Sequence, residues 1–182
     1  EPIGPTLEAI QQEWLMLAAG RQDEVARPFS AILHETFTVL EERLEQKEQP
    51  AYKTGFSCFD NYVGGLQPGS LHILAARPAQ GKTTLMLNWA MNLAIAKTPT
   101  ALFSMEMKDR QLVVKAMASE TPVSGHLLRL GRLEDNWQKV IDRAGEIRNI
   151  PLWICDRRGM GLEELRSRIR RIVRQHQVKV VG

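Results

Sequence analysis

The stretch from Ala75 to Thr84, Ala-Ala-Arg-Pro-Ala-Gln-Gly-Lys-Thr-Thr, places a glycine, a lysine and a hydroxyl side chain side by side. Gly81 lets the backbone approach a phosphate closely, because glycine has no Cβ. The amides that follow open a predicted helix, whose positive end attracts anions. Lys82 is expected to reach the β- and γ-phosphates of a nucleotide, and the Thr83 hydroxyl to bind Mg²⁺, which prefers oxygen ligands. This spacing is typical of a P-loop nucleotide site.

The patterns on either side of this loop support the same interpretation. The apolar run Leu71–Ala76 predicts a strand that leads into the loop, and a helical pattern over Thr83–Ala96 follows it. Ala76 stands where the usual motif has its first glycine, so a chance Gly-Lys-Thr in a strand-to-helix turn is the weaker alternative. We therefore expect a nucleotide to contact the loop residues Ala76, Arg77, Pro78, Ala79, Gln80, Gly81, Lys82, Thr83 and Thr84.

A second candidate, Glu106, lies in the sequence Ser-Met-Glu-Met, directly after the predicted strand Thr100–Ser104. Ligands of open α/β sheets bind at the carboxyl ends of strands, so Glu106 is placed near the γ-phosphate. A carboxylate there can orient and deprotonate an attacking water. Alternatively, Glu106 caps the helix predicted over Lys108–Ser119. The residues alone leave both interpretations open.

Composition and charge narrow the class of protein. The chain has 182 residues and 43% of them are hydrophobic, as in a globular domain with appendages. No apolar run is long enough to cross a bilayer, and no signal-peptide pattern is present. Cys58 and Cys155 form neither a disulfide framework nor a metal-ligand spacing, so we expect reduced thiols in a cytoplasmic protein.

Charge is divided unevenly along the chain. Residues 1–50 carry 10 acidic and 4 basic side chains, a net charge of −6. Residues 51–182 carry 11 acidic and 20 basic side chains, a net charge of +9. The basic part favours a nucleotide or a nucleic acid. The same charge equally serves solubility or a subunit interface, so charge does not identify the partner.

Two helical patterns occupy the acidic part, over residues 6–20 and over Ser30–Gln46. The second has a narrow apolar seam with glutamates on its other faces, and such a seam must dock in a groove. The groove belongs either to its own domain or to a neighbouring subunit. The polar residues 46–53 form a predicted linker. The seam consists of Leu33, Phe37, Leu40 and Leu44.

Strand and helix patterns alternate from Thr54 onward. Right-handed β-α-β crossovers then build a parallel sheet with helices on both faces, which defines an α/β fold. The expected strands are 71–76, 100–104, 152–155 and 178–181, and the expected helices are 83–96, 108–119, 124–130, 135–148 and 162–176. The chain is thus divided into a helical segment (1–27), a linker helix (28–50) and a main domain (51–182).

Arginines gather on the last predicted helix, where they suggest contact with DNA. Helical geometry distributes them over several faces, and Glu164 is spaced to pair with Arg168, so a solvated or interface surface is the better interpretation. For Arg157 and Arg158, the sequence leaves three environments open: a nucleotide, a neighbouring subunit or solvent. The four histidines are scattered and indicate neither a metal site nor a catalytic triad.

Several motifs occur in order along the main domain: Thr54-Gly55-Phe56 to Asp60, Gly65-Leu66, Ala-Arg-Pro-x-x-Gly-Lys-Thr-Thr, Ser-Met-Glu-Met, and Leu162 with Arg166-Ser167-Arg168 to Arg171. In combination they resemble the DnaB family of replicative DNA helicases, which has a RecA-like P-loop ATPase core. The resemblance covers residues 51–182 strongly and 28–50 loosely.

The resemblance implies an ATP-dependent DNA helicase that works as a homo-hexamer, joined through the linker helix, on single-stranded DNA during replication. ATP and Mg²⁺ would be its cofactors, with primase and a helicase loader as further partners and no membrane association. Lys82 and Thr83 would bind phosphate and Mg²⁺, Thr84 would assist at the phosphates, and Glu106 would be the catalytic base.

The ends of the chain are typical of a fragment, since it starts without Met and stops at Gly182, in or just after a strand. In the resembling family, the Walker B aspartate, the DNA-binding loops and a basic finger follow this point, so we expect residues 1–182 alone to hydrolyse negligible ATP. The alternatives are a RecA-like recombinase or related ATPase, and a non-catalytic ATP-bound interaction module. The residues that follow Gly182 discriminate between them.

Overall fold

The computed structural model describes residues 26–44, 51–133 and 136–182 of the chain. These residues belong to two units, Glu1–Gln49 and Pro50–Gly182. The helix predicted over residues 6–20 lies outside the described residues, as does most of the predicted linker.

Helix α2 (Phe29–Leu44) occupies the first unit and confirms the predicted second helix, although residues 45–46 at its expected end are outside the described part. The Arg27 guanidinium pairs with the Glu35 carboxylate, which lowers the pKa of Glu35 and raises that of Arg27. The apolar seam is exposed, with Phe37 at 56% and Leu40 at 44%. Within the described residues of this unit, nothing covers the seam.

Three parallel strands form the sheet of the second unit, in the order β2 (Leu152–Cys155), β1 (Thr100–Phe103) and β3 (Val180–Val181). Thr100 lies opposite Leu152 on one side and Val180 on the other. The central strand is the most buried, because it is hydrogen-bonded on both edges and covered on both faces. The parallel sheet confirms the predicted fold class.

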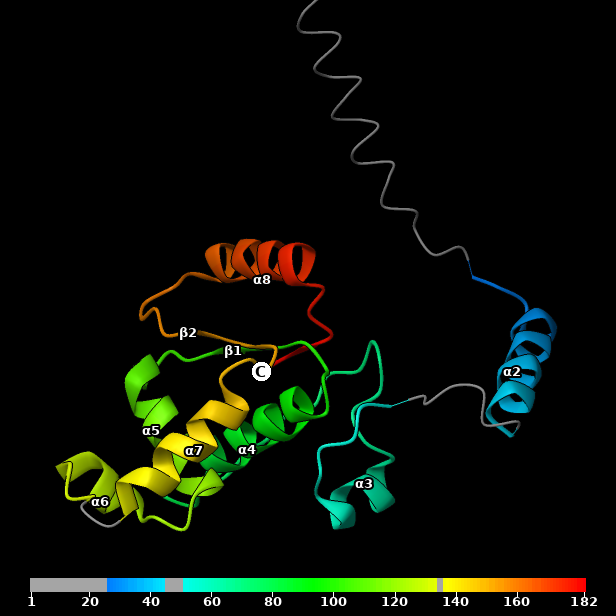
Figure 1. Cartoon of the computed structure of the whole chain (residues 1–182). Coiled ribbons are helices and arrows are strands. Elements are labelled where there is room, and N and C mark those ends of the chain that lie inside the picture. The colour runs from blue at the N-terminus through cyan, green and yellow to red at the C-terminus, as the bar shows by residue number, and fades with distance from the viewer. Residues whose placement is uncertain (1–25, 45–50, 134–135) are drawn as a thin grey trace, which may run out of the picture. The chain divides into compact units, whose positions relative to one another are not determined.

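Helices cover both faces of this sheet (Figure 1). Helix α8 (Leu162–His176) lies over one face, while α4 (Lys82–Ile95) and α7 (Trp137–Ile147) lie on the other side. Helix α5 (Asp109–Glu120) packs against α4 and is followed by α6 (Gly125–Leu130). The predicted helices of this unit are thus present, and their bounds differ from the expected ones by no more than two residues.

The core lies between α4, α5 and the central strand. Side chains from all three meet there, and burying them removes a large apolar area from water. At its margin, the carboxylate of Glu120 in α5 pairs with Arg143 of α7 and raises the pKa of that guanidinium. The apolar core, rather than this ion pair, holds α4 against the sheet. The buried cluster consists of Leu87, Met91, Leu102, Leu112 and Ala116.

The predicted strand over Leu71–Ala76 is wrong for this structure, since none of its residues pairs in a ladder. Leu71 and Ile73 are 85% and 82% exposed. A cavity of about 490 Å³ opens between this segment and β3. A ladder needs a neighbouring strand about 4.8 Å away, and β3 offers only two residues across that cavity. The apolar run indicated a preference for burial but could not supply the pairing partner.

A short helix that periodicity did not predict, α3 (Ser57–Val63), precedes this segment. The Asp60 carboxylate accepts hydrogen bonds from the amide and hydroxyl of Thr54, both at 2.9 Å, and from the Gly55 amide at 3.0 Å. The Asn92 side chain of α4 donates to the Thr54 carbonyl at 2.8 Å. The residues around α3 are thereby tied to the helix that follows the phosphate loop.

Candidate nucleotide-binding site

The phosphate loop enters α4 through a left-handed turn at Gly81, the N-cap residue, whose φ is 84°. Residues with a Cβ rarely adopt this φ, so the turn requires glycine. Just before it, Ala79 also has a positive φ of 64°, and the Gln80 amide donates to the Arg77 carbonyl at 3.3 Å. The amides of the first turn of α4 follow this tight loop and have no intrahelical acceptors.

A cavity of about 470 Å³ opens at this helix end. It is lined by all residues from Ala76 to Thr84 and by Glu106, Met107 and Lys115. The loop and Glu106, which were predicted separately, are therefore brought to one site. The helix-terminal amides and the lysine ammonium supply hydrogen-bond donors for a polyphosphate. The threonine hydroxyls supply oxygen atoms, the type of ligand that Mg²⁺ prefers. The residues present thus fit a nucleotide.

Glu106 reaches this cavity from the loop between β1 and α5. The Ser104 hydroxyl holds this loop in a tight turn, accepting from the Met107 amide at 3.0 Å and donating to the Met107 carbonyl at 2.7 Å. The N-cap of α5 is Lys108, whose amide donates to the Gln111 side chain at 3.2 Å. Capping is therefore carried out by other residues, and Glu106 lies before the helix, among the residues that line the cavity.

Lys115 is a residue of this site that the sequence analysis missed. It lies on α5, and its Nζ is 3.4 Å from the Thr84 hydroxyl oxygen. On the same helix, Leu112 and Ala116 are buried in the core. In the sequence, the available signal was a lysine within an apolar stretch of the predicted helix. Sequence spacing alone could not show that this stretch faces the phosphate loop.

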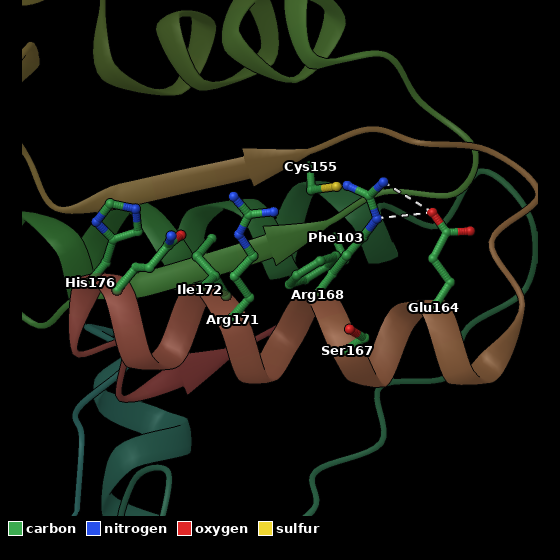
Figure 2. A pocket seen from close by; sticks show the side chains of 9 residues that line it. Phe103, Cys155, Glu164, Ser167, Arg168, Arg171, Ile172 and His176 are labelled. Atoms are coloured by element: carbon green, nitrogen blue, oxygen red, sulfur yellow. Dashed lines mark hydrogen bonds and ion pairs between the residues drawn. The ribbon is translucent and has the colours of Figure 1, made fainter. Parts of the chain in front are cut away.

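A second cavity, of about 500 Å³, lies between α8 and the ends of β1 and β2 (Figure 2). Arg168 pairs with Glu164 at 3.0 Å, as the spacing predicted, and His176 stacks on Trp153 with ring centroids 4.5 Å apart. The Arg171 side chain extends toward the sheet. Its lining residues include no glycine, and Glu164 is the one that comes from the first turn of α8, where its carboxylate is already paired with Arg168. This cavity therefore lacks the backbone donors that distinguish the phosphate loop.

Metal clusters and membrane-spanning helices are both missing from the part of the chain that the structure describes. Those residues contain no group of three or more His, Cys, Asp or Glu side chains placed to hold a metal ion. None of the described helices is both long and apolar enough to span a membrane.

A parallel sheet covered by helices on both faces, with a phosphate-type loop at the start of one helix, defines an α/β fold of the P-loop class. More specifically, the chain belongs to the family of the DnaB-like helicase C terminal domain, whose model matches residues 51–182. The resemblance drawn from the motifs is thus confirmed. Membership of this family implies that the domain uses a nucleotide.

Named relatives agree with this assignment. The chain is 33% identical over 178 residues to the replicative DNA helicase DnaB of Treponema pallidum (strain Nichols), covering 96% of this chain and 41% of that protein. It is 39% identical over 127 residues to the replicative DNA helicase DnaB of Pasteurella multocida (strain Pm70), covering 68% of this chain and 27% of that protein. The chain therefore spans less than half the length of these relatives.

The matches to solved structures have low identity and show the fold. One solved ATPase domain matches with a TM-score of 0.72 and 23% identity, over 82% of this chain and 54% of that one. A DnaB-like replicative helicase, solved in a study of its interactions with primase, also matches with a TM-score of 0.72 and 24% identity. This match covers 97% of this chain and 42% of the helicase chain.

Lys82→Ala is expected to weaken nucleotide binding at least tenfold without unfolding the domain. A hydrogen bond to a charged group contributes about 1.5–3 kcal/mol, and Lys82 lines an open cavity rather than the core. Isothermal titration with a non-hydrolysable ATP analogue measures the change, and circular dichroism checks the fold. Lys139→Ala, which removes a positive charge from α7 away from the cavity, is the matched control. Equal affinities for the two variants would contradict the assignment of this loop.

Proposed function

We propose that this chain contributes the nucleotide-hydrolysing part of a replicative DNA helicase, which uses ATP and Mg²⁺ to translocate on single-stranded DNA in the cytoplasm. The observation that carries the proposal is the position of Glu106 in the same cavity as the phosphate loop. Either feature alone is compatible with simple nucleotide binding. A carboxylate in the same cavity as the phosphate-binding amides adds a group that can act on water.

The division of roles follows from the chemistry of each side chain. Lys82 neutralises charge on the β- and γ-phosphates, and the Thr83 hydroxyl binds the metal ion. Thr84 holds the phosphates from the next position of the helix. Glu106 orients the attacking water and accepts its proton. When bound, ATP would supply the phosphoryl group that is transferred to water, and Mg²⁺ held by the Thr83 hydroxyl would neutralise charge on the phosphates.

We propose that α2 is a linker helix that joins subunits of a homo-hexamer. Its exposed seam needs a covering surface, and the net charge of −6 on residues 1–50 complements the +9 on residues 51–182. In this organisation, residues 1–27 end an N-terminal region, 28–50 form the linker, and 51–182 begin the ATPase domain. Primase and a helicase loader are proposed as further partners, and the interaction of a structural relative with primase supports the first of these.

Glu106→Gln is expected to keep nucleotide affinity and to reduce ATP turnover by at least about a hundredfold. The amide preserves the size of the side chain but cannot accept the proton of the attacking water, and general base catalysis contributes about 10²–10⁴ in rate. A coupled-enzyme ATPase assay on the full-length protein with single-stranded DNA measures turnover. Turnover near that of the wild type would remove Glu106 from the reaction and leave a nucleotide-binding module as the better function.

Phe37→Ala combined with Leu40→Ala is expected to shift hexamers of the full-length protein toward smaller species. Truncating a docked Phe or Leu costs about 2–5 kcal/mol, and both side chains lie on the α2 seam. Analytical ultracentrifugation at low protein concentration measures the distribution. Val39→Ala removes an equally exposed apolar side chain on another face of α2 and serves as the control. If the double variant stays hexameric, this seam is not the subunit contact.

A further inference from the structure

Two loops at the carboxyl end of the sheet are hydrogen-bonded to each other. The first follows β1 and carries Glu106, and the second follows β2. Arg158 Nη2 of the second loop donates to the backbone carbonyl oxygen of Glu106 at 2.8 Å. Beside it, the Asp109 amide at the start of α5 donates to the Asp156 carboxylate at 3.2 Å. The loop with the proposed catalytic carboxylate is thus held at two backbone positions.

The second loop is itself anchored to α8. Arg157 Nε lies 3.4 Å from the Glu164 carboxylate in the first turn of that helix, and Glu164 also holds Arg168 at 3.0 Å (Figure 2). Gly159 turns the loop with a φ of 70°. The neighbouring arginines of this loop therefore have different roles, since Arg157 contacts α8 and Arg158 contacts the loop of Glu106.

We propose that Arg158 is a positioning residue for Glu106. By holding the Glu106 carbonyl, it fixes the direction in which the carboxylate leaves the backbone and enters the phosphate cavity. Arg158 is not among the described residues that line this cavity, so it acts through Glu106 rather than on phosphate. The proposal rests on the catalytic role proposed for Glu106. It assigns a role to Arg158, for which the sequence left contact with a nucleotide, with a neighbouring subunit or with solvent as alternatives.

The expected effect is on the rate of the chemical step and not on nucleotide affinity. A catalytic group misplaced by about 1 Å can lose about a hundredfold in rate. Asp156 still holds the loop when Arg158 is removed, so a smaller loss is expected. Arg158→Ala should lower kcat about tenfold and leave KM and analogue binding unchanged. Arg158→Lys, whose ammonium can also donate to a carbonyl, should recover part of kcat.

The experiment compares the wild type, Arg158→Ala and Arg158→Lys in the full-length protein. Steady-state ATPase assays give kcat and KM, and isothermal titration with a non-hydrolysable ATP analogue gives the affinity and the number of sites. Arg170→Ala is the matched control, because it removes an exposed arginine of α8 that lies outside the phosphate cavity. Its kcat should match that of the wild type.

Each outcome decides the proposal. A lower kcat with full binding stoichiometry and recovery by lysine supports positioning. An unchanged kcat in Arg158→Ala overturns the proposal. A loss of kcat that is matched by an equal loss of nucleotide-binding sites also overturns it, because that result indicates damage to the fold. A loss that lysine leaves unrepaired also overturns the carbonyl contact as the cause. Failure of the proposed function is separate, because the wild type itself would then neither bind the analogue nor hydrolyse ATP.

Discussion

Parallel pairing of β1 with β2 is the constraint on which the site depends. The register from Thr100–Leu152 to Phe103–Cys155 makes both strands end at the same edge of the sheet. The loops that follow must then emerge side by side, and they bring Glu106 and Arg158 within hydrogen-bonding reach. An antiparallel partner for β1 would have placed the two loops at opposite edges. The direction of the strands thus determines which side chains can cooperate.

The phosphate loop is positioned by a different interaction, the packing of α4 on the central strand. Leu87 and Met91 of α4 are buried against Leu102, which fixes the helix axis relative to the sheet. The loop segment before Gly81 contributes no ladder hydrogen bonds in this structure. The start of α4, and with it the anion-attracting helix end, is therefore placed by apolar burial. The same core holds α5, which brings Lys115 to Thr84.

Local patterns predicted much of this organisation. The loop motif, the helix after it and Glu106 at the end of β1 followed from short-range spacing, and the helices and the parallel sheet followed from periodicity. Leu71–Ala76 failed because an apolar run does not specify a pairing partner. Lys115 and Arg158 were not assigned roles because each depends on contacts between residues far apart in the sequence, 31 positions for Lys115 with Thr84 and 52 for Arg158 with Glu106.

The central claim is that the start of α4 and the Glu106 loop form one nucleotide site. It is tested most directly by titrating isotopically labelled residues 1–182 with ADP and Mg²⁺ and following the backbone amides by NMR. The account predicts that the largest shifts fall on Gly81–Thr84, with a further shift at Glu106. Shifts concentrated instead on Arg168, Arg171 and His176, in the cavity beneath α8, would contradict it.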